Sequence, residues 1–125
     1  LRYRRTALGR WPMSYEIAFD QFLKVHICVG RVTRAEPFPE ARKPAIKLWV
    51  DFGPGIGEKK TSAQITELYT PEALQGRQVM AVVNFPPRQI GPLMSEVLVL
   101  GAADEEGRIV LVAPDSDVPA GARMH

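Results

Sequence analysis

The stretch "AIKLWVDFGPGIGEKKTSAQI", from Ala45 to Ile65, contains the strongest indication of fold in the chain. Its first part alternates between apolar residues on one face and polar or amphipathic residues on the other, which is the period of a half-buried β-strand. The apolar face holds Ile46, Leu48, Val50 and Phe52, and the opposite face holds Lys47, Trp49 and Asp51. The turn-forming run "PGIGE" then leads into a second, more polar strand over residues 59–65. Two consecutive strands are therefore predicted.

The segments before this pair predict one helix and one further strand. "SYEIAFDQFL" begins with Ser14, a good N-cap, and its composition indicates a short helix that is too apolar to lie alone in water. "KVHICVGRVTRAE", residues 24–36, is rich in β-branched residues and predicts a strand in which Gly30 marks a bend or bulge. The proline-bounded run "PFPEARKP", residues 37–44, is then the loop to the next strand.

The segments after the pair predict a second short helix and two or three strands. In "YTPEALQG", Thr70 is the N-cap, Pro71 occupies the first helical position and Gly76 ends the helix. Strands follow over residues 77–84 and 95–102, and the turn "DEEGR" leads into another in "RIVLVA". The stretch "FPPRQIGPLM" is interrupted by prolines that cannot belong to a central strand, so we expect it to be a loop.

The order of these elements contains no alternation of strand and helix, so a parallel sheet is not expected. Five strands with one helix between the third and the fourth match the OB-fold barrel. We therefore predict an all-β protein with small helices, built as a five-stranded OB-fold barrel with an N-terminal helix and a C-terminal extension. In that fold the second and third strands, with the loops "PFPEARKP" and "FPPRQIGPLM", form the binding face. An all-β barrel of another topology would keep the strands but not this face.

Composition and charge place the chain among ordinary globular proteins. It has 125 residues, 46% of them hydrophobic and 24% charged, which suits one domain. No apolar run approaches the roughly 20 residues of a membrane span, so we expect a soluble protein without membrane insertion. Four arginines precede Met13, whereas residues 13–125 hold 12 basic and 14 acidic residues. We expect residues 1–12 to be a disordered extension or a foreign addition, Met13 to be the natural start and residues 13–125 to be the domain.

Residues that could support catalysis or metal binding are few. Cys28 lies in an apolar run and has no partner for an intrachain disulfide, which fits a reducing, cytoplasmic compartment. His26 is the nearest base, but a buried, inert thiol is the simpler interpretation. With two histidines and no acidic cluster at ligand spacing, no metal is expected. Since no phosphate loop, nucleophile elbow or carboxylate pair occurs either, we expect no catalytic residues, no cofactor and no enzyme activity.

Three runs, "VGRV", "PEARKPAIKLWVDFG" and "GRQVMAVVNFPPRQIGPLMSEVLVLGA", resemble the CsaA family of small bacterial proteins within the wider tRNA-binding-domain family. The resemblance extends from Tyr15 to Arg123. It implies an OB-fold homodimer that binds tRNA or, for CsaA, acts as a chaperone-like partner of unfolded or export-destined polypeptides. The relatives usually follow Ser-Glu with Gly-Met, whereas this chain has Val97 and Leu98, a departure that matches the CsaA branch and weighs against strong tRNA binding.

By position, the resemblance implies ligand contacts for Arg42, Lys43, Lys47, Asn84, Ser95 and Glu96. Arg42 and Lys43 could contact phosphates from a proline-stiffened loop, or could simply be solvated. Asn84 and Ser95 could bond an unpaired base edge or a peptide backbone, although Asn at a strand end is also a common turn residue. Glu96 would repel phosphate but can accept hydrogen bonds from base amines or peptide N–H groups.

The loop between the fourth and fifth strands also contains an apolar set, namely Phe85, Ile90, Leu93 and Met94. Such side chains offer an adaptable surface suited to varied peptide segments, and the alternative is that a dimer interface buries them. Trp49 faces away from the core side of its strand. It could stack on a base, cover an exposed apolar segment or pack under the N-terminal helix, and we favour packing.

Three functional hypotheses follow. The first is a non-enzymatic, chaperone-like homodimer that binds exposed segments of unfolded or precursor polypeptides. Its interface would include Phe19 and Phe22, because so short an apolar helix needs something to pack against. The alternative is a structure-specific tRNA-binding protein, and a protein with both activities in one groove is a third. The tRNA-binding residues would be Arg42, Lys43, Lys47, Asn84 and Glu96.

Overall fold

The computed structural model describes residues 16–125, so Ser14 and the expected extension over residues 1–12 lie outside the described residues. The elements, in chain order, are α1 (Phe19–Leu23), β1 (Ile27–Pro37), β2 (Ile46–Asp51), α2 (Gly53–Ile56), β3 (Glu58–Ala63), α3 (Pro71–Leu74), β4 (Gln78–Val82), β5 (Arg88–Ile90), β6 (Leu93–Ser95), β7 (Leu98–Val99), β8 (Gly101–Ala103) and β9 (Ile109–Leu111).

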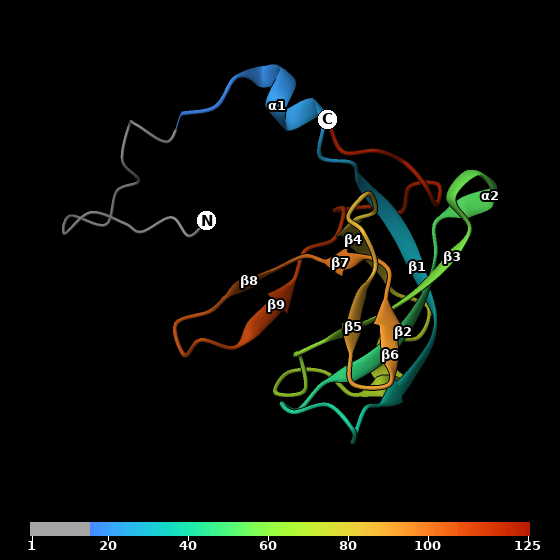
Figure 1. The fold of residues 1–125 in the computed structure, drawn as a ribbon, viewed down its shortest axis with the longest axis vertical. Coiled ribbons are helices and arrows are strands. Elements are labelled where there is room, and N and C mark those ends of the chain that lie inside the picture. The colour runs from blue at the N-terminus through green and yellow to red at the C-terminus, as the bar shows by residue number, and fades with distance from the viewer. Residues whose placement is uncertain (1–15) are drawn as a thin grey trace.

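Five strands form one antiparallel sheet in the order β3-β2-β1-β4-β7, which curls into a nearly closed barrel. Two hairpins, β5–β6 and β8–β9, are attached to it, and the second extends away from the barrel wall (Figure 1). This arrangement confirms the predicted fold class, a five-stranded OB-fold barrel with small helices.

Strand β1 belongs to both halves of the barrel. Residues 27–31 pair with β4, whereas residues 31–37 pair with β2, and the register shifts between Val32 and Arg34. This irregularity is a β-bulge, which bends the strand and increases its twist. The bend therefore lies between Val32 and Arg34, a few residues after Gly30, where it was predicted.

Gly30 itself has a steric role. A Cβ atom there would lie 2.5 Å from Cγ1 of Val50 and 2.7 Å from Cε1 of Phe52, both of which are fully buried. Real carbon contacts do not approach so closely, so the core residues of β2 can pack against β1 because position 30 has no side chain. The buried cluster around this contact includes Val32, Ile46, Leu48, Leu74 and Val79.

The C-terminal segment confirms the expected extension and lies along the outer edge of β1. The Gly121 N–H donates to the Val29 carbonyl at 2.7 Å, and the Val29 N–H donates to the Ala122 carbonyl at 2.8 Å. The Met124 N–H donates to the Ile27 carbonyl at 2.8 Å, which brings the chain end beside α1 (Figure 1). The first half of β1 is therefore hydrogen-bonded on both edges.

Three local predictions were correct and one was wrong. Thr70 caps α3 by accepting a hydrogen bond from the Ala73 N–H, and Gly76 follows the helix with a φ of 83°. The N-terminal helix begins at Phe19 rather than near Ser14, because the Gln21 side chain accepts from the Ala18 N–H and caps it there. The turn "PGIGE" connects β2 to β3 as predicted, and part of it belongs to the single helical turn α2.

The connection between β4 and β7 also differs from the prediction. It contains the hairpin β5–β6, whereas a loop was expected, and the expected continuous strand over residues 95–102 is divided among β6, β7 and β8. The chain leaves the barrel at Gly101, where a Cβ would lie 2.5 Å from Cγ2 of Ile109. Strand β8 then pairs with β9 and not with the main sheet.

Among residues 16–125, none of the helices has the length and apolar character needed to span a bilayer.

Replacing Gly30 with Ala should destabilise the barrel, because the new methyl group would displace buried Val50 and Phe52. We expect a loss of about 1–3 kcal/mol in the free energy of unfolding, measured by urea denaturation. The matched control is Gly55→Ala, since a Cβ there meets no atom within 4 Å, and it should change stability by less than about 0.5 kcal/mol. Equal effects of the two substitutions would contradict the steric role of Gly30.

Candidate functional site

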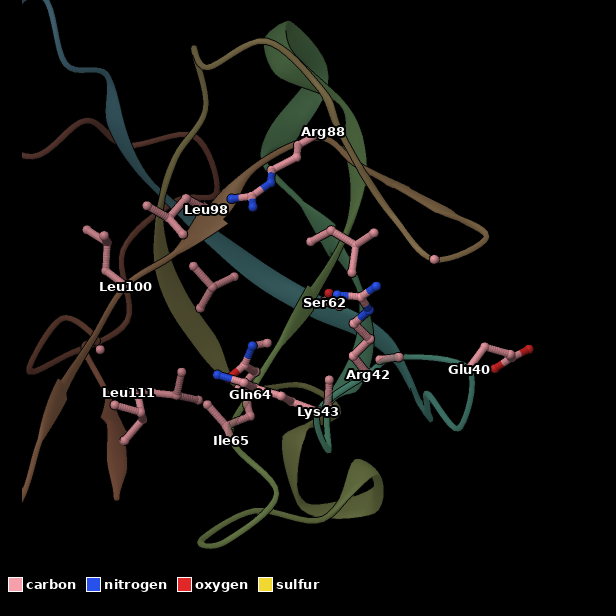
Figure 2. Close-up of a pocket in the computed structure, with 18 of the residues that line it drawn as sticks. Glu40, Arg42, Lys43, Ser62, Gln64, Ile65, Arg88, Leu98, Leu100 and Leu111 are labelled. Carbon is pink, nitrogen blue, oxygen red and sulfur yellow. The ribbon is translucent and has the colours of Figure 1, made fainter. Parts of the chain in front are cut away.

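A groove of about 840 Å³ lies between the β1–β2 loop, the end of β3 and the hairpin β5–β6. We call it the main groove. Figure 2 shows Arg88 extending over it from β5, with Lys43 and Gln64 on the opposite side. Apolar side chains form its floor and one wall, and these include Ile65, Leu98, Leu100 and Leu111.

A second depression of about 390 Å³, the side pocket, adjoins the main groove. The residues that line both are Ser62, Arg88, Ile90 and Leu98. Phe85, Pro86, Ser95 and Glu96 are among the residues that line the side pocket but not the main groove. Phe85 is 52% exposed. Together the two depressions form a continuous, largely apolar surface with Arg88 between them.

The main groove has a positive rim. Arg42 and Lys43 come from the β1–β2 loop and Arg88 comes from the hairpin, and all three are exposed. Among the described residues, none of them forms an ion pair with a carboxylate. Glu40 also lines the groove, but its carboxylate points outward, away from the cavity (Figure 2). An anionic group could therefore approach this rim without displacing an internal partner.

Lys47 does not line either depression. Its ammonium lies 5.0 Å from the centroid of the Phe38 ring, a cation–π contact. Phe38 packs with Ala45 and Leu93 in a small buried cluster that joins the β1–β2 loop to the hairpin. Lys47 thus covers the cluster that supports the groove.

Ser95 and Glu96 have partners within the protein. The Thr61 hydroxyl donates to the Val97 carbonyl at 2.7 Å and lies 2.8 Å from Ser95 Oγ, and both side chains are buried. The Lys60 N–H donates to the Glu96 carboxylate at 3.0 Å, and the Glu96 N–H donates to the Lys60 carbonyl at 2.9 Å. These bonds join β3 to residues 95–97 and close the barrel on that side. Ser95 and Glu96 therefore stabilise the barrel through these hydrogen bonds.

Asn84 also has internal partners, and it lies outside the lining of both depressions. Its Oδ1 accepts a hydrogen bond from the His26 N–H at 2.9 Å, and its Nδ2 donates to the Lys24 carbonyl at 2.7 Å. The amide thus fastens the end of β4 to the connection between α1 and β1. The structure separates it from Arg42, Lys43 and Arg88.

The apolar residues of the hairpin divide between two faces. Leu93 is buried against the Phe38 cluster, and Ile90 is half-buried and lines both depressions. Met94 is 41% exposed but lines neither. Cross-strand partners share a face, so Arg88, paired with Ser95, lies on the other face from Met94. Phe85 lines the side pocket and Ile90 lines both depressions, whereas Met94 lines neither.

The sequence pattern indicated no role for Arg88, Gln64 or Leu98. Arg88 lies in the predicted binding loop, and this position was the one indication in the sequence that it could contact a ligand. A single arginine among prolines forms no recognisable binding motif. Leu98 has the composition of a core strand residue, yet its side chain is 50% exposed. Trp49 is half-buried beneath Arg34, whose guanidinium lies 4.5 Å from the ring centroid, rather than beneath the helix that we favoured.

Metal binding and thiol reactivity can be assessed from the described residues. Among residues 16–125, no group of three or more His, Cys, Asp and Glu side chains is arranged to hold a metal ion. Cys28 is buried and free, and burial raises the pKa of its thiol while nearby Arg123 acts in the opposite direction. A thiol with a raised pKa is a weak nucleophile.

The chain matches a family described as a putative tRNA binding domain over residues 27–123. It is 40% identical over 119 residues to methionine–tRNA ligase 1 of Sorangium cellulosum. This match covers 95% of this chain and 17% of that protein. It is 34% identical over 113 residues to the methionine–tRNA ligase of Porphyromonas gingivalis, covering 90% of this chain and 16% of that protein. The chain thus spans about one-sixth of the length of these ligases.

Two solved structures match along nearly their whole length. Chaperone CsaA from Bacillus anthracis str. Ames is 48% identical, with a TM-score of 0.83, and the match covers 88% of this chain and 99% of that one. A CsaA chaperone protein from Picrophilus torridus is 44% identical, with a TM-score of 0.82, covering 88% of this chain and 100% of that one. Together with the family match, these similarities show that the chain belongs to the CsaA family within the tRNA-binding-domain family.

Proposed function

We propose that this protein is a non-enzymatic, chaperone-like protein that binds exposed segments of unfolded or export-destined polypeptides, and that it acts as a cytoplasmic homodimer. The observation that carries the proposal is the continuous apolar surface of the two depressions, where Phe85 and Leu98 are each about half exposed. The similarity to two structures described as CsaA chaperones supports it.

The shape of this surface suits an extended polypeptide. A strand-like segment presents side chains alternately to two sides, so neighbouring depressions can each accept one apolar residue. Branched and aromatic walls adapt to varied apolar side chains without selecting one of them. Ser62 and Gln64 add polar groups beside the apolar walls, and these can bond a peptide backbone.

A structure-specific tRNA-binding function is the alternative, and the positive rim is the observation that favours it. Arg42, Lys43 and Arg88 lie on two sides of one groove without described carboxylate partners. Phosphates could bind there, and the family match supports this possibility. The remainder of the groove lining is mainly apolar, however, and an RNA backbone would leave that surface uncovered.

Dimerisation through α1 and the residues next to it is proposed from their exposed apolar side chains. Phe19 is 72% exposed, Ile17 61% and Leu23 47%, and exposed Val25 and Met124 belong to segments beside the helix. Phe22 is half-buried, and its ring centroid lies 6.1 Å from that of Phe19. A five-residue helix with no buried residue gains little from the barrel, so a partner surface would stabilise it.

Replacing Phe85 with Ala should weaken peptide binding, because it removes the ring that lines the side pocket. We expect about a 5- to 10-fold rise in Kd for a fluorescein-labelled, unfolded peptide rich in Leu and Phe, measured by fluorescence anisotropy. Met94→Ala is the matched control, since Met94 is similarly exposed on the same hairpin but lies outside both depressions. The proposal fails if Phe85→Ala leaves peptide affinity unchanged in a folded protein.

Replacing Arg42 and Lys43 together with Ala should decide the tRNA alternative. If tRNA is the ligand, the double substitution should remove most of the affinity and lower the slope of log K against log salt by about 2, because two phosphate contacts are lost. Lys24→Ala, which removes a charge outside the groove lining, is the control. Under the chaperone proposal, wild-type tRNA binding is weak at moderate salt and peptide binding survives the double substitution.

Replacing Phe19 with Asp should convert the dimer to a monomer while preserving the fold, because the ring is largely exposed within one chain. Light scattering at micromolar concentration measures the change in mass. Leu68→Asp is the control, since Leu68 is an exposed apolar residue that lies outside α1. A monomeric wild type under these conditions would rule out the proposed interface.

A further inference from the structure

The charge of the main groove differs from that of the rest of the described chain. Residues 16–125 carry 12 basic and 14 acidic side chains, so this part of the molecule is slightly acidic. The groove lining nevertheless has three basic residues, Arg42, Lys43 and Arg88, and one acidic residue, Glu40, which points away from it (Figure 2). A ligand with a negatively charged group would therefore be complementary to the groove.

Arg88 is the central cation. It lines both the main groove and the side pocket, so mainly apolar surface lies on two sides of it, and Glu96 is the acidic residue in the lining of the side pocket. Its backbone is held by pairing with Ser95 across the hairpin and by the preceding Pro86 and Pro87. On the same hairpin, buried Leu93 anchors β6 to the Phe38 cluster. The backbone that carries Arg88 is therefore held in place, and its guanidinium extends toward Leu98 (Figure 2).

A guanidinium in this setting favours a carboxylate with an apolar neighbour. Its planar fork can bind both oxygens of a carboxylate, and such charge-assisted bonds strengthen where neighbouring side chains exclude water. Ile90 and Leu98 lie beside Arg88 and line the same depressions, so they can contact the adjoining apolar side chain. A phosphodiester could also bind the Arg88 guanidinium, but the sugars on either side of it would not cover the neighbouring apolar surface.

We propose that the groove selects polypeptide segments in which Glu or Asp lies beside a large apolar residue, and that Arg88 is the specificity-determining residue that binds the carboxylate. This inference rests on the proposed polypeptide-binding function and adds the chemical class of segment that is preferred. Arg42 and Lys43 attract the acidic segment from the opposite rim, where exposed charges act at longer range and are screened by salt.

Three labelled peptides test the inference with the full chain. They are unfolded, about 12 residues long and rich in Leu and Phe, and they differ at one central position, which is Glu, Gln or Lys. We expect the Glu peptide to bind about 5- to 10-fold more tightly than the Gln peptide at low salt, and the Lys peptide to bind most weakly. The preference for Glu should decrease as salt is raised.

Variants of Arg88 assign the preference to that side chain. Arg88→Gln should equalise the affinities for the Glu and Gln peptides while changing that for the Gln peptide by less than about twofold, because the apolar contacts remain. Arg88→Lys keeps the charge but not the fork, so it should restore part of the preference. Lys24→Gln removes the same charge outside the groove lining and should preserve the full preference.

The possible failures are distinguishable. Equal affinity of the wild type for the Glu and Gln peptides, or a preference that survives Arg88→Gln, would overturn this inference, while the Phe85 variant would still test the proposed function separately. If no peptide binds and tRNA binding depends on Arg88, both the inference and the polypeptide-binding proposal are wrong.

Discussion

The close contact of β1 with the core side chains of β2 is the constraint on which the rest of the barrel depends. One strand must pair with β4 at its beginning and with β2 at its end, so it has to bend strongly and still bury a face. Gly30 permits Val50 and Phe52 to lie where a side chain on β1 would otherwise project. The bulge that follows rotates the strand toward its second partner. A barrel of this size can close because the bend and the missing side chain occur within a few residues of each other.

Closure on the other side of the barrel determines which residues remain free to bind a ligand. Thr61 and Ser95 bond each other beside the Val97 carbonyl, and Glu96 bonds the backbone of β3. Polar groups that are satisfied internally would lose those bonds on turning to a ligand, which costs free energy. We therefore expect recognition to depend on groups that lack such partners among residues 16–125. These include Arg88, the exposed ring of Phe85 and the apolar walls on either side of them.

The exposed apolar residues of the molecule fall into separate regions with different expected roles. Phe85 and Leu98 belong to depressions that have polar groups nearby, an arrangement that suits a ligand held in a fixed orientation. Phe19 and its neighbours project from a five-residue helix without a buried residue, an arrangement that suits a contact with another chain. Asn84 connects these regions, because it fastens the base of α1 to the end of β4, from which the hairpin continues.

The sequence by itself determined the elements whose causes are local. Strict alternation over residues 46–52 predicted β2, and the cap Thr70 with the terminating Gly76 predicted α3, because period and capping act within a few residues. It did not predict the hairpin β5–β6, since three-residue strands are too short to show a period. Tertiary structure alone decided the roles of Asn84, Ser95 and Glu96, whose partners lie 34 to 60 residues away in the chain. It likewise decided that Arg88 lines the groove while Met94 does not, because the face of the hairpin that turns toward the barrel is the one on which Leu93 packs against Phe38.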